Sequence, residues 1–132
     1  MAATEDHHPG ERGRVTAAIS NAVVRLTREY TGRGPTKART YINDDTVTTF
    51  LADTLTKGER ALVAKGEDET VREMRRVFQR AMRNDLCGAV EQLTERQVIA
   101  FFSDAHIEPD MAVESFVLAP QAVSDGPDQP SV

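Results

Sequence analysis

Hydrophobic residues recur every three or four positions in two long segments of the chain, which is the spacing of one face of an α-helix. The first segment covers residues 11–30 and the second covers about residues 68–95. Between them, Thr56 and Glu59 form a capping-box sequence that begins a short helix, which ends at Gly66. The pattern therefore predicts two long helices and one short helix.

Four shorter segments alternate polar residues with β-branched or aromatic ones, as strands do. Two of them, residues 37–42 and 46–52, flank an Asn-Asp-Asp turn, and the other two, residues 96–104 and 111–119, flank the turn sequence AHIEPD. The order is α-β-β-α-α-β-β. It predicts an α+β two-layer sandwich, in which a four-stranded, mostly antiparallel sheet carries its helices packed on one face.

The other face of such a sheet has no helix to cover it. Either Phe50, or Val47 and Leu51, would lie on that face, because strand residues alternate between the two sides. A small single-layer sheet often dimerises to cover its open side, so we expect a homo-oligomer, most simply a dimer.

Composition limits the class of protein. Residues 1–11 and 120–132 are polar and lack periodicity, so we expect a disordered N-terminal arm, one domain at residues 12–119 and a disordered C-terminal tail. The net charge of −5 disfavours a nucleic-acid-binding domain. The longest apolar run, residues 98–102, is far shorter than the ~20 residues of a transmembrane helix. A single cysteine and an N-terminus without a signal-peptide pattern favour the cytoplasm.

The glycine-rich sequence GRGPTKART at residues 32–40 invites comparison with a phosphate-binding loop. A Walker-type loop leads from a strand into a helix, whose N-terminal N–H groups face the phosphates. Here a helix precedes the loop and a strand follows it, so Gly32 is predicted as a helix C-cap. The cations of this basic corner, Arg33, Lys37 and Arg39, are candidates for binding a partner or an anion.

The second long helix carries a stripe of arginines beside its apolar line: Arg72, Arg76, Arg80 and Arg83. Glu69 and Glu73 are placed to pair with two of them at i,i+3 spacing. One interpretation is a solvated helix face with ion pairs. The other is a docking surface for an acidic partner, lipid headgroups or an anion, since arginine binds carboxylates and phosphates with two hydrogen bonds.

The turn sequence around His106 contains acidic residues at alternate positions. In a continuous strand, Asp104, His106, Glu108 and Asp110 would share a face and have the chemistry of a divalent-cation site. Because Pro109 indicates a turn, we expect a hydrogen-bonded loop and no metal. Asp104, His106 and Asp110 remain a candidate pH-sensitive loop, since imidazole changes charge near neutral pH. The sequence indicates no catalytic residues and no cofactor, so we expect a protein that is not an enzyme.

Several of these motifs together resemble the MpsC family. They are GRGPTKART, the LTKGE that follows the first hairpin, the arginine-rich helix, and SDAHIEPD followed by ESFVL. The resemblance covers about residues 15–118. It implies the soluble third component of a sodium-translocating, membrane-potential-generating system. The other components of that system resemble a proton-channel subunit of respiratory complex I and a zinc protein linked to inorganic-carbon uptake. The resemblance implies an accessory role and assigns no catalytic residues.

Two hypotheses follow. The first is a non-catalytic cytoplasmic accessory protein, placed peripherally at the inner face of the membrane, that binds a membrane protein of a cation and inorganic-carbon transport system. The second is a small anion-binding domain or enzyme that uses the basic corner and the His106 loop. A closed pocket holding both the corner and His106 would favour the second.

Overall fold

The structure, a computed structural model that describes residues 7–121, has the predicted order of elements. The helices and strands are α1 (His7–Thr31), β1 (Lys37–Asn43), β2 (Thr46–Ala52), α2 (Lys57–Ala64), α3 (Asp68–Thr94), β3 (Val98–His106) and β4 (Met111–Leu118). The α+β fold class is confirmed. Residues 1–6 of the predicted arm and residues 122–132 of the predicted tail lie outside the described residues.

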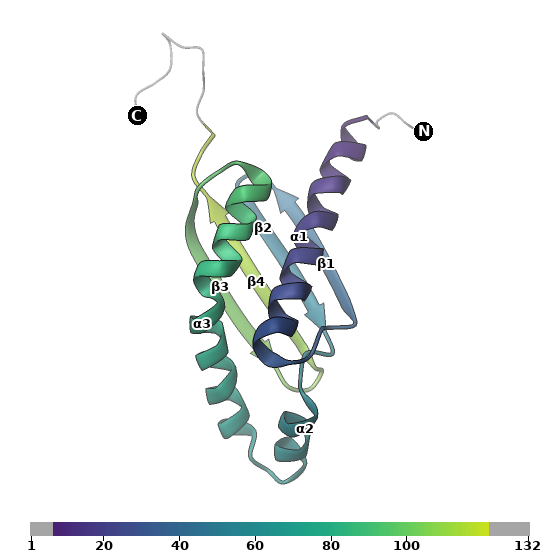
Figure 1. The fold of residues 1–132 in the computed structure, drawn as a ribbon, viewed down its shortest axis with the longest axis vertical. Coiled ribbons are helices and arrows are strands. Elements are labelled where there is room, and N and C mark those ends of the chain that lie inside the picture. Colours follow the sequence, from purple (N-terminus) through teal and green to yellow (C-terminus); the bar gives the residue numbers. More distant parts are fainter. Residues whose placement is uncertain (1–6, 122–132) are drawn as a thin grey trace.

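The sheet has the strand order β1-β2-β4-β3, and every pairing is antiparallel. Each hairpin contributes two neighbouring strands, and β2 joins the hairpins by pairing with β4, where Leu51 faces Ala112. Helices α1 and α3 lie on one face of this sheet, and α2 lies beyond one end of it (Figure 1). The other face carries no helix in the described part of the chain.

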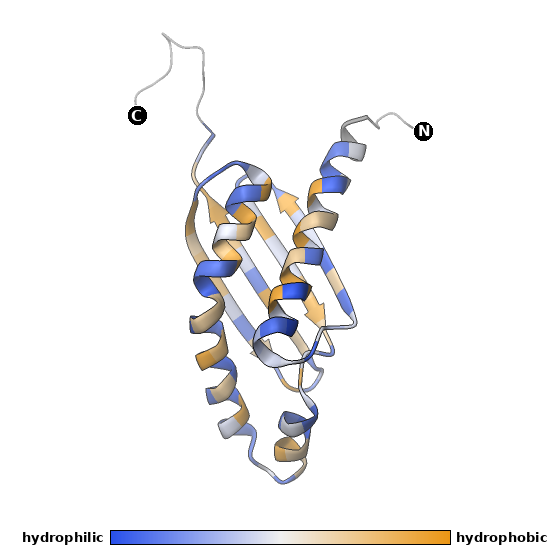
Figure 2. Ribbon diagram, viewed as in Figure 1, coloured by the Kyte–Doolittle hydropathy of each residue, from blue (hydrophilic) through white to orange (hydrophobic). Residues whose placement is uncertain are grey.

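The hydrophobic core lies between the sheet and the two long helices. In Figure 2, hydrophobic residues form bands along both helices among hydrophilic ones, as the three-four spacing requires. The buried apolar residues of this core are Ile19, Val23 and Leu26 from α1, Met82, Leu86 and Val90 from α3, and Val47, Leu51, Ala112, Phe116 and Leu118 from the sheet. Phe50 is 43% exposed. Phe50, rather than Val47 and Leu51, therefore lies on the open face.

The predicted bounds of α1 and β3 differ most from those in the structure. Helix α1 begins at His7 instead of residue 11, so residues 7–11 of the predicted arm are helical. Residues 10–14 are exposed, and hydrophobic periodicity does not detect the part of a helix that extends beyond its buried face. Strand β3 continues through Asp104 to His106, because β4 begins at Met111 and pairs with it directly.

Local signals in the connections are confirmed. The Thr56 hydroxyl accepts a hydrogen bond from the N–H of Glu59 at 3.1 Å, and the Glu59 carboxylate accepts one from the N–H of Thr56 at 2.9 Å, which completes the capping box. Gly66 follows α2 with a positive φ of 81°. Within residues 7–121, no helix combines the length and the apolar character needed to cross a membrane.

Candidate functional site

Four exposed arginines follow one side of α3 and form what we call the arginine face: Arg72, Arg76, Arg80 and Arg83. Two of them make the predicted i,i+3 ion pairs. Arg72 lies 3.3 Å from the carboxylate of Glu69, and Arg76 lies 2.7 Å from that of Glu73. The two arginines are about half exposed and the two glutamates more than half, so the pairs hold the side chains loosely and leave much of the positive charge toward solvent.

The C-terminal part of the arginine face borders a hollow between α3 and β3. Its volume is about 250 Å³, and it is lined by Arg76, Gln79, Arg80, Arg83, Phe101 and Ser103. The guanidinium carbon of Arg83 lies 5.5 Å above the ring of Phe101, a cation–π contact that orients this side chain. Neither Arg80 nor Arg83 has an ion pair with any residue in the range 7–121. The hollow therefore concentrates guanidinium groups whose donors are available to an anionic group.

The charges at this surface stabilise one another. The hydrogen bond from Arg76 lowers the pKa of Glu73, and the same contact raises the pKa of Arg76, with smaller contributions from Glu69 and Asp104. Arg76 thus keeps its positive charge at all physiological pH values.

The basic corner does not come together as one site. Arg33 donates from Nε to the carbonyl oxygen of Asp53 at 2.9 Å, which ties it to the end of β2. Lys37 and Arg39 lie on β1 and point to the open face of the sheet. Arg33 therefore holds the loop against the end of β2, whereas Lys37 and Arg39 are exposed on the open face.

The glycine-rich loop ends α1 and leads into β1. Gly32 has a φ of 84°, a conformation that favours glycine, and its N–H donates to the carbonyl oxygen of Arg28 at 2.8 Å. A Cβ on Gly34 would lie 2.8 Å from Nε of Arg28, so the loop also lets this side chain pack closely. The predicted C-cap is confirmed.

The His106 region divides between two sides of the molecule. Asp104 and His106 are exposed on β3, on the same face, since the strand continues through both. Asp110 turns the other way: its carboxylate accepts hydrogen bonds from the N–H groups of Thr54 and Leu55 and from the Thr54 hydroxyl, at 2.9 to 3.2 Å. Asp110 therefore fixes the β2–α2 connection, and the candidate pH-sensitive group reduces to Asp104 and His106.

These positions do not form a metal centre. His106 contacts the carbonyl oxygen of Pro109 through Nδ1 at 2.9 Å, so this nitrogen carries the proton. Among the side chains of residues 7–121 that the structure describes, no three His, Cys, Asp or Glu groups are placed to hold an ion.

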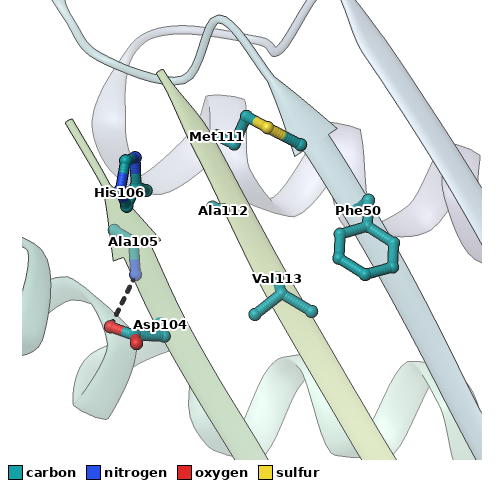
Figure 3. A pocket seen from close by; sticks show the side chains of 7 residues that line it. All are labelled: Phe50, Asp104, Ala105, His106, Met111, Ala112 and Val113. Carbon is teal, nitrogen blue, oxygen red and sulfur yellow. Dashed lines mark hydrogen bonds between the residues drawn. The ribbon is translucent and has the colours of Figure 1, made fainter. Parts of the chain in front are cut away.

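The open face contains two shallow hollows that adjoin each other. One, of about 220 Å³, is bordered by Asp104, His106, Val113 and Met111, with Phe50 on its far side (Figure 3). The other is bordered by Lys37 and Arg39 and shares Phe50 and Met111. Lys37 and His106 lie on opposite edge strands, three inter-strand spacings or about 14 Å apart. They do not meet in one closed pocket.

Two buried charged sites were missed in the sequence. Arg75, on α3, lies 3.1 Å from the carboxylate of Glu59, and both side chains are buried. Glu114 lies on the helix-covered face of β4 and is 6% exposed. Burial raises its pKa to about 7, against the opposing effects of Ser103 and Arg75. The position of each residue in the sequence pattern could have indicated its burial. Arg75 falls on the apolar line of α3, and Glu114 alternates with Ala112 and Phe116.

Comparison with known proteins gives one result. The family model described as "Na+-translocating membrane potential-generating system (MpsC)" matches residues 11–120, nearly all of the region that the structure describes. This match confirms the resemblance carried by the sequence motifs. No curated protein and no solved structure matches the chain.

Proposed function

The chain belongs to the MpsC family, and on this premise we propose that it is a non-catalytic accessory component of a Na⁺-translocating, membrane-potential-generating system. In this proposal it stays in the cytoplasm, at the inner face of the membrane. There it docks through its arginine face onto an acidic surface of a membrane-protein partner that serves cation and inorganic-carbon transport.

The observation that carries this proposal is the grouping of Arg76, Arg80 and Arg83 around one hollow on a chain whose net charge is −5. The net negative charge of the protein repels anions, but a local cluster of guanidinium groups attracts them. Each guanidinium can bind a carboxylate with two parallel hydrogen bonds, which gives orientation as well as attraction.

The shape of the hollow suits a side chain of a partner better than a free ion. The hollow has a volume of about 250 Å³ and opens to solvent between α3 and the edge strand β3. The Phe101 ring forms part of its wall. An aspartate or glutamate that enters would meet guanidinium donors around its carboxylate and an apolar ring against its methylene groups. The structure thus supports recognition of an acidic segment of protein.

The test measures how much of the membrane subunit co-purifies with the protein from detergent-solubilised membranes. The test variant reverses the charges at the hollow: Arg76→Glu, Arg80→Glu and Arg83→Glu. The matched control reverses Arg12, Arg14 and Arg25, which are exposed on α1 and change the net charge by the same amount. We expect the control to retain the membrane subunit and the test variant to lose it, because attraction becomes repulsion at each contact. Equal retention by both variants, each folded by circular dichroism, would contradict the proposal.

The alternative function, an anion-binding domain or enzyme at the basic corner and His106, has weaker support. Arg33 is bonded to the backbone of Asp53, and Asp110 is bonded to the β2–α2 connection. The remaining groups lie on opposite edges of the open face. Titration with phosphate or bicarbonate, followed by the amide NMR signals of Lys37, Arg39 and His106, distinguishes this alternative, since docking through α3 predicts no shift there.

A further inference from the structure

The open face of the sheet has an apolar centre that extends across all four strands. Its large side chains are Tyr41 on β1, Phe50 on β2, Met111 and Val113 on β4, and Phe102 on β3. Four of these, all but Val113, are between 39% and 62% exposed. Tyr41 and Phe50 contact each other edge to face, with ring centroids 6.4 Å apart. Exposed apolar side chains that gather on one face, as Phe50 and Met111 do at the border of both hollows, are typical of an interaction site.

Opposite charges lie at the two edges of this centre. The strand register places Arg39, Phe50, Val113 and Asp104 in one row across the sheet, with the cation on β1 and the anion on β3. The neighbouring row runs from Lys37 on β1 to His106 on β3, and its two ends do not carry opposite charges. Within residues 7–121, neither Arg39 nor Asp104 has an ion pair.

This distribution is self-complementary under one rotation. When two such sheets pack face to face around a two-fold axis parallel to the strands, between β2 and β4, each β1 lies over the β3 of the other copy. Arg39 then faces Asp104 of the partner subunit, and the reciprocal pair forms by symmetry. Packed sheets lie about 10 Å apart, a gap that an arginine and an aspartate can bridge when they extend toward each other.

We propose that the open face binds a second copy of this chain in a two-fold dimer, in which Arg39 of each subunit pairs with Asp104 of the partner subunit. The apolar centres of the two faces meet and lose their contact with water, while the ion pairs at both edges set the relative orientation of the subunits. The arginine face on α3 lies on the helix layer and stays free in this dimer, so the inference does not depend on the proposed docking function.

Other occupants fit the charges less well. A membrane surface with anionic lipids attracts a face whose charges are all positive, and Asp104 stands on one edge of this face. A basic partner is repelled by Lys37 and Arg39, and an acidic one by Asp104. A second copy satisfies both edges at once.

The test uses sedimentation velocity on the full chain over a concentration series, with two variants, Arg39→Asp and Asp104→Arg. Wild-type protein should have twice the 14.5 kDa mass of the chain. Each variant alone places like charges opposite each other at both edges, so its dimer dissociation constant should rise at least tenfold. Mixing the two variants restores opposite charges at both edges, and the mixture should form a dimer with near wild-type affinity. Arg14→Asp, far from the open face on α1, serves as the control and should leave dimerisation unchanged.

Three results would overturn the proposal. A wild-type chain that remains monomeric at several hundred micromolar rules out the dimer. A dimer that neither variant weakens, or two weakened variants whose mixture stays monomeric, rules out the Arg39–Asp104 pairing. Circular dichroism of each variant confirms that a loss of dimer is not a loss of fold, and Phe50→Ser, which removes the centre of the face, provides an independent way to weaken the same contact.

Discussion

Arg75 and Glu59 form an ion pair of 3.1 Å whose side chains are 9% and 1% exposed. The Glu59 oxygen that binds Arg75 also accepts the capping hydrogen bond from the N–H of Thr56. Arg75 makes a second, longer contact of 3.3 Å with the carbonyl oxygen of Thr54. One guanidinium therefore joins α3 to the first turn of α2 and to the loop before it.

Replacement of Arg75 by methionine should destabilise the fold strongly, because it leaves the Glu59 carboxylate buried without its partner. Breaking one side of a buried pair costs about 3–5 kcal/mol. Urea unfolding measures the loss, and Arg72→Met, on the exposed side of the same helix, should cost about 1 kcal/mol or less. Adding Glu59→Gln to Arg75→Met should recover part of the stability. A loss of stability in Arg75→Met that is no larger than in Arg72→Met would show that this buried ion pair does not stabilise the fold.

The sequence predicted the capping box but not this ion pair, and the reason is physical. A capping box depends on residues three apart, which the sequence shows directly. The ion pair joins residues that are 16 apart in the sequence and meet only because α2 and α3 pack together. A search for hydrophobic spacing does not detect a charged residue that occupies a buried position. Similarly, the pairing of β2 with β4 brings Leu51 to Ala112 over a long stretch of chain, and local alternation carries no information about such a contact.

Glu114 should make the stability of the protein depend on pH. Its folded-state pKa of about 7 lies above the usual 4.5, so the folded state holds a proton that the unfolded state releases. Stability therefore falls as pH rises from about 4.5 to 7 and stays low above that range. In this window the contribution of Glu114 to the free energy of unfolding drops by roughly 2 to 3 kcal/mol.

Urea unfolding of wild-type protein and Glu114→Gln between pH 5 and pH 8 measures this effect. Glutamine keeps the size of the side chain and cannot ionise, so its advantage over wild type should grow with pH. A difference between the two proteins that is constant over this range would mean that Glu114 is not held protonated by burial. Glu29→Gln, at an exposed position of α1, is the matched control and should show little pH-dependent difference.

The candidate sites were predictable to different degrees. The arginine stripe follows from helical spacing alone, and the structure places all four side chains on one exposed side of α3. What the sequence did not show is the hollow, because its other wall is Phe101 on β3. The Asp104, His106 and Asp110 loop was grouped by closeness in sequence, yet the extension of β3 turns Asp110 toward Thr54 and away from the other two.

The most direct measurement for the central claim, docking through the arginine face, is photo-crosslinking in cells. A photoreactive amino acid replaces Gln79, which lines the hollow, or Val77, which is 48% exposed on the same helix and does not line it. We predict that position 79 crosslinks to a membrane subunit, that position 77 does not, and that Arg80→Glu with Arg83→Glu abolishes the crosslink. Equal crosslinking from both positions, or crosslinking from position 77 alone, would contradict the account.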